Sequence, residues 1–193
     1  MIFFAFQRRG HGASEGPYIR DLQKQINRRL PIGPERQRET ILLHEDYNAD
    51  VTVAVRYLLA RADVDPNRIV MTGVSFGGIQ SLLSAEEGLG VRGFIVFAPG
   101  AQSWFNPLLR ERLARATRDS RAPIFLAQAQ NDYSTGPVQS LGPIVEAKGP
   151  PSRAILYPAF GTTQRQGHGG FAVRGGISVW RSDVSTFLTA VLR

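Results

Sequence analysis

The 193-residue chain contains no cysteine and only two lysines, Lys24 and Lys148. The absence of cysteine excludes a disulfide framework, a cysteine-rich zinc site and a cysteine nucleophile. No apolar run approaches the roughly 18 residues that a membrane-spanning helix needs. The short apolar stretch Ile2–Phe6 precedes the basic residues Arg8 and Arg9, which reverses the order found in a signal peptide. We therefore expect a soluble, cytoplasmic protein with no membrane partner.

The balance of residue types is typical of a globular domain. Hydrophobic residues make up 42% of the chain and charged residues 20%, which is enough apolar material for one sizeable core at this length. The 20 glycines and 12 prolines fall below the share that marks a low-complexity or disordered polymer. We expect one domain that spans residues 1–193.

The formal net charge of +7, with 21 arginines among 23 basic residues, raises the question of a nucleic-acid partner. Basic residues are densest over residues 20–38, but Gly33, Pro34 and Glu35 interrupt this stretch. No nucleic-acid-binding motif accompanies it. We interpret the stretch as a solvated face and expect no nucleic-acid partner.

Short apolar runs alternate with helical segments along the chain. Such runs are typical of parallel strands buried on both faces, and they occur at Ile2–Phe6, Arg68–Thr72, Gly93–Ala98, Pro123–Ala129 and Arg153–Tyr157. Amphipathic spacing predicts a helix around residues 51–59, and further helices are expected over Phe76–Glu87, Pro107–Arg118, Pro137–Lys148 and Gly176–Leu192. The alternation predicts an α/β fold, a mostly parallel sheet of about five strands with helices on both faces.

The second predicted strand is followed by Gly-x-Ser-x-Gly at residues 73–77, directly before a helix. Ligands of such sheets bind at the carboxyl ends of the strands, and a sharp strand-to-helix turn exposes a serine hydroxyl beside backbone N–H groups. We predict that Ser75 is a nucleophile and that the turn leaves no space for side chains at Gly73 and Gly77. Capping of the helix is the alternative role for Ser75.

A serine nucleophile needs a base, and the base needs a carboxylate that orients it. Asp132 follows the fourth apolar run and His168 follows the fifth, so both are predicted to lie at the same edge of the sheet. Organisation of a turn is the alternative role for Asp132. His11 lies in a glycine-rich loop, and His44 is interpreted as a surface or packing residue of the amphipathic helix. No pair of histidines has metal-ligand spacing, and we expect no metal and no cofactor.

These residues resemble the alpha/beta-hydrolase superfamily, and within it the dienelactone-hydrolase-like and prolyl-oligopeptidase-like serine hydrolases. Three stretches carry the resemblance: Gln7–Gly16, which is similar to an Arg-Gly-x-Gly-x-Ser loop, Gly73–Gly78, and Tyr157–Phe171. Their joint order along the chain is more specific than any one of them.

The resemblance implies that Ser75 is the acylated nucleophile, that His168 acts as general base and then acid, and that Asp132 orients His168. It also implies that the Phe76 backbone N–H donates to the oxyanion. Dienelactone hydrolases use cysteine, so a serine favours hydrolysis of an ester, lactone or amide. An oligopeptidase-type peptidase and a non-catalytic remnant of the fold are the alternatives.

The chain departs from the family pattern at its start. If Ile2–Phe6 corresponds to the fourth strand of the family fold, the first three strands and the first helix have no counterpart. The loop after the third strand normally supplies the second oxyanion donor, and Gly10–Gly16 is the glycine-rich replacement that the sequence offers. We also expect Met1 to begin a strand that is buried in the sheet.

The expected substrate is a small-molecule ester or amide. Trp104, Phe105 and Tyr133 follow predicted strands and are candidates for lining an acyl pocket. Packing against the next helix is an equally good interpretation of Trp104 and Phe105. The sequence carries no signal for an oligomeric state.

Overall fold

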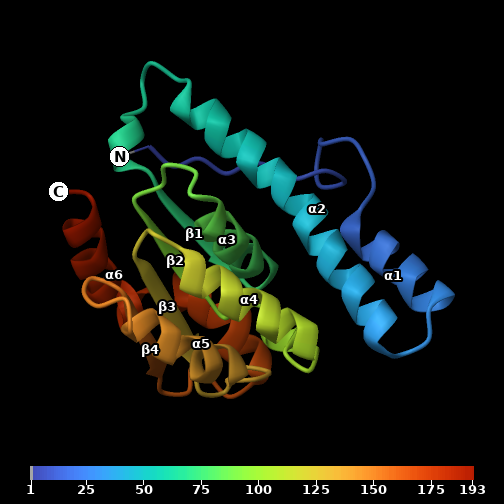
Figure 1. Cartoon of the computed structure of the whole chain (residues 1–193). Helices are drawn as coiled ribbons and strands as arrows, with labels where there is room; N and C mark the ends of the chain where they lie inside the picture. Colours follow the sequence, from blue (N-terminus) through green and yellow to red (C-terminus); the bar gives the residue numbers. More distant parts are fainter. Residues whose placement is uncertain (1) are drawn as a thin grey trace. The chain divides into compact units, whose positions relative to one another are not determined.

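The structure is a computed structural model that describes residues 2–193 and divides into two compact units, one up to Asp65 and one from Pro66 to Arg193. The larger unit contains a fully parallel four-stranded sheet with the strand order β1-β2-β3-β4. The strands are β1 (Val70–Val74), β2 (Gly93–Phe97), β3 (Ile124–Ala129) and β4 (Arg153–Tyr157), as Figure 1 shows. Four of the predicted strands are thereby confirmed, and with them the α/β class.

A helix follows every strand of the larger unit. The helices are α3 (Phe76–Glu87), α4 (Pro107–Asp119), α5 (Gly136–Glu146) and α6 (Ile177–Val191). Asn106 caps α4, since its Oδ1 accepts hydrogen bonds from the backbone N–H groups of Leu108 and Leu109. All four helices were predicted from the alternation of apolar runs and amphipathic segments, with the bounds of α3 as observed and those of the other three within two residues.

The two faces of the sheet are covered by different helices. One face carries Val74, Phe97, Ala127 and Ile155, which share a core with Val184, Phe187 and Val191 of α6. The opposite face carries Gly73, Val96, Leu126 and Ala154. On that face Gly73 lies against α3 and Ala154 against α5, and α4 packs between these two helices. Helices on both faces were predicted.

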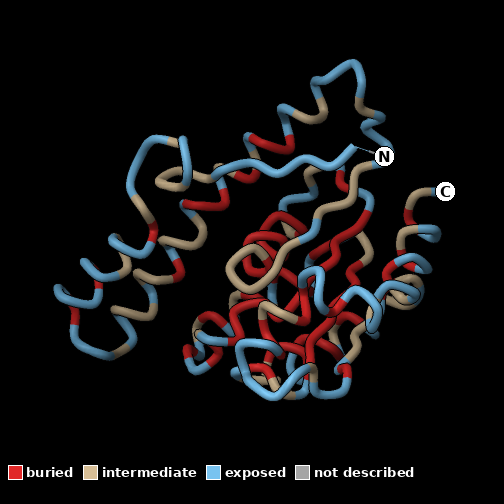
Figure 2. Tube along the Cα trace, turned by 180° about the vertical axis from the view of Figure 1, so that it is seen from behind, coloured by how far each residue is buried: buried red, intermediate tan, exposed pale blue. Residues whose placement is uncertain are grey.

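Burial explains why β2 and β3 read as continuous apolar runs. Every residue of both strands is buried, because each strand lies inside the sheet and is covered on both faces. Figure 2 shows the same concentration of buried residues in the strands and the helices that pack on them. The outer strand β4 has exposed residues at Arg153 and Leu156, which is typical of an edge.

The smaller unit contains two helices, α1 (Ile19–Arg29) and α2 (Pro34–Leu59). Pro34 occupies the first turn of α2 after Gly33, where a missing backbone N–H costs nothing. The predicted helix around residues 51–59 is the last part of α2. Basic side chains of residues 20–38 bond within the unit, for instance Arg29 to Glu39 at 3.1 Å and Lys24 to Asp21 at 2.9 Å.

The turn before α1 is tied to α2 through one arginine. Arg9 Nε donates to Asp50 Oδ1 at 3.0 Å, its Nη1 lies 2.9 Å from Asp46 Oδ2, and its guanidinium stacks over the Tyr47 ring. Gly10 is at φ 72°, and a Cβ there would lie 2.4 Å from the Pro17 carbonyl oxygen. Only glycine fits this contact. The local structure therefore explains both residues of the Arg9-Gly10 pair.

The prediction of a strand at Ile2–Phe6 is wrong. These residues form no strand, and Ile2 and Phe3 are 61% and 84% exposed. A strand needs a hydrogen-bonded neighbour, and the ladder of the sheet begins at β1. The expectation that Met1 begins a buried strand lies outside the described residues. Within residues 2–193 no helix combines the length and apolarity that crossing a membrane requires.

The core of the larger unit generates a stability prediction. Phe125 is 1% exposed and its ring centroid lies 5.8 Å from that of Phe187 in α6. Phe125→Ala should lower the free energy of unfolding by about 3–5 kcal/mol, because it leaves a cavity between the sheet and α6. The matched control is Phe105→Ala, since Phe105 is 81% exposed. Equal urea midpoints for the two variants, measured by circular dichroism, would contradict this view of the core.

Candidate active site

Ser75 lies at the junction of β1 and α3 with a strained backbone. Its φ of 56° and ψ of −109° lie outside the regions that L-residues favour, at a cost of about 1–3 kcal/mol. Surrounding bonds hold this conformation: the Ser75 N–H donates to the Phe97 carbonyl at 3.0 Å, and the Ser75 carbonyl accepts from Gly100 at 3.3 Å. The hydroxyl makes no capping bond to α3, so the capping alternative does not explain this serine.

The glycines around Ser75 have separate functions. A Cβ at Gly73 would lie 2.1 Å from the Gly77 carbonyl oxygen, whereas a Cβ at Gly77 would meet nothing within 4 Å. A Cβ at Gly78 would lie 3.1 Å from both the Phe97 oxygen and Pro99 Cα. The prediction that the turn has no space for a side chain is therefore right for Gly73 and wrong for Gly77. Gly77 takes part in the contact through its backbone carbonyl, which lies against Gly73.

The structure brings Asp132 and His168 together from loops that follow β3 and β4. His168 Nδ1 lies 2.8 Å from Asp132 Oδ1, and the exposed fractions of the two side chains are 10% and 0%. The two atoms are in close contact, but His168 Nδ1 makes no hydrogen bond of full geometry within the described residues. Catalytic hydrogen bonds are often misaligned without substrate and tighten when it binds.

The Asp132 carboxylate has further donors. Its Oδ1 accepts from the Tyr133 backbone N–H at 2.6 Å, and its Oδ2 accepts from Gln128 Nε2 at 2.8 Å. A buried carboxylate needs such partners, because burying an unpaired charge is costly. Gln128 is a residue of the site that the sequence analysis did not identify, although a glutamine inside an apolar strand is a usable signal.

His168 lies in a π-helical turn, Gln166–Gly170, which the sequence analysis did not predict. Such turns are rare and occur often at functional sites. Asn131 connects this segment to the loop of Asp132: its Nδ2 donates to the carbonyls of Phe160 and Thr163 at 3.0 and 3.1 Å. A Cβ at Gly167 would lie 2.4 Å from Asn131 Oδ1. Asn131 therefore fixes the loop after β3, which contains Asp132, against the segment after β4 that leads to His168.

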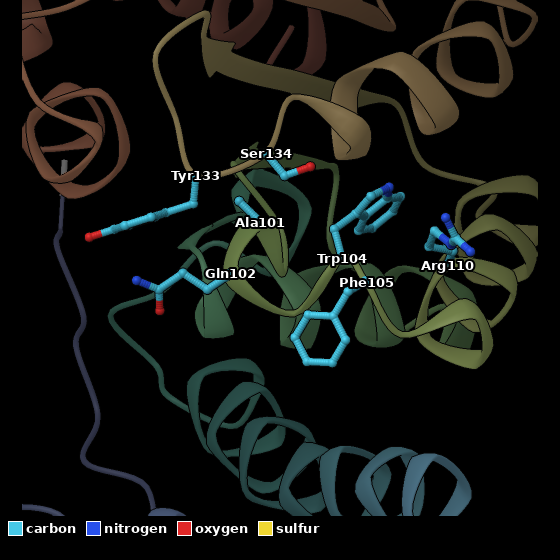
Figure 3. A pocket seen from close by; sticks show the side chains of 7 residues that line it. All are labelled: Ala101, Gln102, Trp104, Phe105, Arg110, Tyr133 and Ser134. Atoms are coloured by element: carbon cyan, nitrogen blue, oxygen red, sulfur yellow. The ribbon is translucent and has the colours of Figure 1, made fainter. Parts of the chain in front are cut away.

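A cavity of about 420 Å³ lies beside this site and is lined by Ala101, Gln102, Trp104, Phe105, Arg110, Tyr133 and Ser134 (Figure 3). The Tyr133 ring packs edge-on against His168 with centroids 5.2 Å apart. On the other side, Ala101 follows Gly100, whose N–H donates to the Ser75 carbonyl. Trp104 is buried against Gly136, whereas Phe105 is exposed. Trp104 therefore both packs against the start of α5 and lines the cavity.

The remaining histidines are held in the smaller unit. Arg8 donates to His11 Nε2 at 2.9 Å, and His11 Nδ1 lies 3.1 Å from the Arg9 carbonyl, so both ring nitrogens have partners. Burial, helped by Arg8, lowers the pKa of His44 to about 4, which leaves this imidazole neutral at pH 7. Among residues 2–193 no group of three or more acidic or histidine side chains is placed to hold a metal ion.

Within the described residues Ser75 and His168 are not joined by a hydrogen bond. Phe76, directly after Ser75, is the first residue of α3. What the structure brings together is the pair Asp132–His168, with Tyr133 against it. The strained Ser75 lies at the carboxyl end of β1 in the same parallel sheet. This arrangement provides a serine at a helix N-terminus and an imidazole backed by a buried carboxylate.

The fold defines an α/β protein whose candidate site lies in the loops at the carboxyl ends of its parallel strands. A sequence model of the alpha/beta hydrolase family matches residues 3–190. The chain therefore belongs to the alpha/beta hydrolase family. A search of curated protein sequences finds no match.

Solved structures with the same fold include three from bacteria and archaea. An esterase of Pyrococcus furiosus is 17% identical, with a TM-score of 0.61 over 98% of this chain and 70% of the esterase. A dienelactone-hydrolase-type protein of Klebsiella pneumoniae is 15% identical, with a TM-score of 0.56 over 84% and 69%. Thermogutta terrifontis esterase 2, phosphoramylated by tabun, is 21% identical, with a TM-score of 0.51 over 76% and 62%.

The glycine geometry generates a matched pair of variants. Gly73→Ala should lower the free energy of unfolding by about 1–3 kcal/mol, because the new methyl group meets rigid backbone. Gly77→Ala should raise it by about 0.5–1 kcal/mol, because alanine favours the helix and the space is open. Thermal unfolding of both variants checks this. Equal shifts in the same direction would show that the turn is not packed as described.

Proposed function

We propose that the protein is a cofactor-free serine hydrolase that cleaves a small ester, lactone or amide through an acyl-enzyme on Ser75. The observation that carries the proposal is the contact of the His168 imidazole with the buried Asp132 carboxylate. A neutral imidazole held by a carboxylate is the arrangement that activates a serine hydroxyl. The match of the family model across residues 3–190 supports our further proposal that one hydrolase domain spans residues 1–193.

In the first step the Ser75 Oγ attacks the substrate carbonyl carbon, and His168 Nε2 takes the hydroxyl proton. The carbonyl oxygen becomes an oxyanion, for which we propose the Phe76 backbone N–H as one donor at the N-terminus of α3. His168 then gives the proton to the leaving alcohol or amine, and the acyl group stays on Ser75.

In the second step a water molecule takes the place of the leaving group. His168 removes a proton from this water, the hydroxide adds to the acyl carbon, and the acid product leaves as the proton returns to Ser75. Asp132 keeps the imidazole in one tautomer with its proton on Nδ1 and stabilises the imidazolium that forms in each step. This division of roles requires the Nδ1–Oδ1 contact that the site provides.

The cavity supports the choice of a small substrate. Its volume of about 420 Å³ is at the low end of the range for small-molecule sites, and one of its lining residues, Tyr133, packs against His168. We propose that Trp104 and Tyr133 contact the acyl group, because their rings provide apolar surface beside the reacting carbonyl.

Labelling with a fluorophosphonate tests the proposal without knowledge of the substrate. Thermogutta terrifontis esterase 2 is known with a tabun adduct, which supports an organophosphorus probe. We expect one adduct, on Ser75, and none in Ser75→Ala. His168→Ala should slow labelling by at least about 10³-fold and Asp132→Asn somewhat less, because the three groups act as a unit.

The matched control is Ser140→Ala, an exposed serine of α5. It should label at the wild-type rate. Mass spectrometry of the digested protein locates the adduct, and circular dichroism shows that each variant is folded. A folded wild-type chain that is not labelled, or a Ser75→Ala chain that is labelled equally, would overturn the proposed function.

The labelling rate should also depend on pH. An imidazole accepts a proton only when it is neutral, so we expect the labelling rate to rise with pH. The measurement is the rate constant of labelling in a series of buffers at constant ionic strength. A rate that is independent of pH, or that falls, would argue against His168 as the base.

A further inference from the structure

Gln128 is a polar residue with no exposure inside a strand that is otherwise apolar. It is the fifth of six residues in β3, and all six are buried. Its neighbour in β4 is Leu156, and it lies on the same face of the sheet as Leu126, two residues before it. An amide in this position is costly unless its hydrogen bonds are made.

All three polar contacts of the Gln128 amide lead to the loop of Asp132 and the start of α5. Its Nε2 donates to Asp132 Oδ2 at 2.8 Å and to the Ser134 carbonyl at 2.6 Å. Its Oε1 accepts from the Val138 backbone N–H at 3.2 Å. Turning the amide over would place two oxygen acceptors against Oε1 and an N–H against Nε2, so the surroundings allow one orientation.

The Asp132 carboxylate depends on this amide for its rotation. The oxygen Oδ1 is used by His168 and by the Tyr133 N–H, whereas Gln128 is the side-chain donor to Oδ2 within the described residues. Partners at both oxygens fix the plane of the carboxylate. This matters because the Nδ1–Oδ1 contact is close but is not yet a full hydrogen bond, so the orientation of the carboxylate decides whether that bond can form.

We propose that Gln128 is a positioning residue of the hydrolase site, which holds the Asp132 carboxylate so that Oδ1 faces His168. The inference rests on the proposed function, since it concerns the same Ser75, His168 and Asp132. Gln128 touches neither the substrate nor the reacting atoms. Its effect on the reaction passes through Asp132, and this distinguishes it from a residue that only stabilises the fold.

The first variant is Gln128→Met, which keeps the length of the side chain and removes its donor and acceptor. We expect the rate constant of fluorophosphonate labelling at Ser75 to fall by roughly 10–100-fold, the range typical of partners that orient a catalytic group. The matched control is Gln139→Met, an exposed glutamine of α5, which should label at the wild-type rate.

A second variant separates the donor from the acceptor. Gln128→Glu keeps an oxygen for the Val138 N–H but places a second carboxylate beside Asp132, which disfavours two negative charges at once. At pH 8 its labelling rate should fall at least as far as that of Gln128→Met. This variant carries the test if Gln128→Met does not fold, as judged by circular dichroism.

A double-mutant cycle shows whether Gln128 acts through Asp132. Gln128→Met in the Asp132→Asn background should cause no further loss of labelling rate, because the carboxylate it positions is gone. A residue with a merely structural effect would cause the same fold loss in both backgrounds, and that result would overturn the inference.

The outcomes also separate the inference from the function on which it rests. If the wild-type chain is not labelled at Ser75, the proposed function fails, and the inference with it. If the wild-type chain is labelled and the folded Gln128 variants are labelled at the same rate, the proposed function stands and the inference is wrong.

Discussion

The site depends on one buried negative charge. The Asp132 side chain has no exposure, and a carboxylate in that position must find donors within the protein. It finds two, the Tyr133 backbone N–H and the Gln128 amide, and the His168 imidazole lies in close contact on a third side. Satisfying this charge therefore fixes the loop after β3 against the strand and also brings the turn after β4 to the same place.

The parallel sheet makes this meeting possible. All four strands run in one direction, so the loops after β1, β3 and β4 leave from one edge, where ligands of such sheets bind. At β1 the chain turns sharply into α3 and places Ser75 in a strained conformation that a close approach of Gly73 to the Gly77 backbone permits. Backbone strain at Ser75 and a buried charge at Asp132 are both costs to stability, and both lie where the chemistry is proposed.

Much of this could be predicted from the sequence, since buried strands are apolar throughout and motif residues follow them. The apolar stretch Ile2–Phe6 was misinterpreted because apolarity alone does not say whether a strand has a neighbour to pair with. The helix α1 was not predicted, although Ile19, Leu22 and Ile26 follow helical spacing, because the basic residues between them were interpreted only as a solvated face. The roles of Gly77 and Gln128 could be recognised only in the structure. For Gly77 the space around a Cβ decides its role, and for Gln128 the hydrogen-bond partners of its amide do.

A crystal structure of the chain after reaction with a fluorophosphonate tests the central claim most directly. We expect phosphorus on the Ser75 Oγ, a phosphonyl oxygen facing the Phe76 N–H, and His168 Nε2 within hydrogen-bond distance of the Ser75 oxygen. The Asp132 carboxylate should remain between Gln128 and His168, now with an aligned bond to Nδ1. Phosphorus on another residue, or an Asp132 side chain turned away from His168, would contradict the claim that these residues act as one catalytic unit.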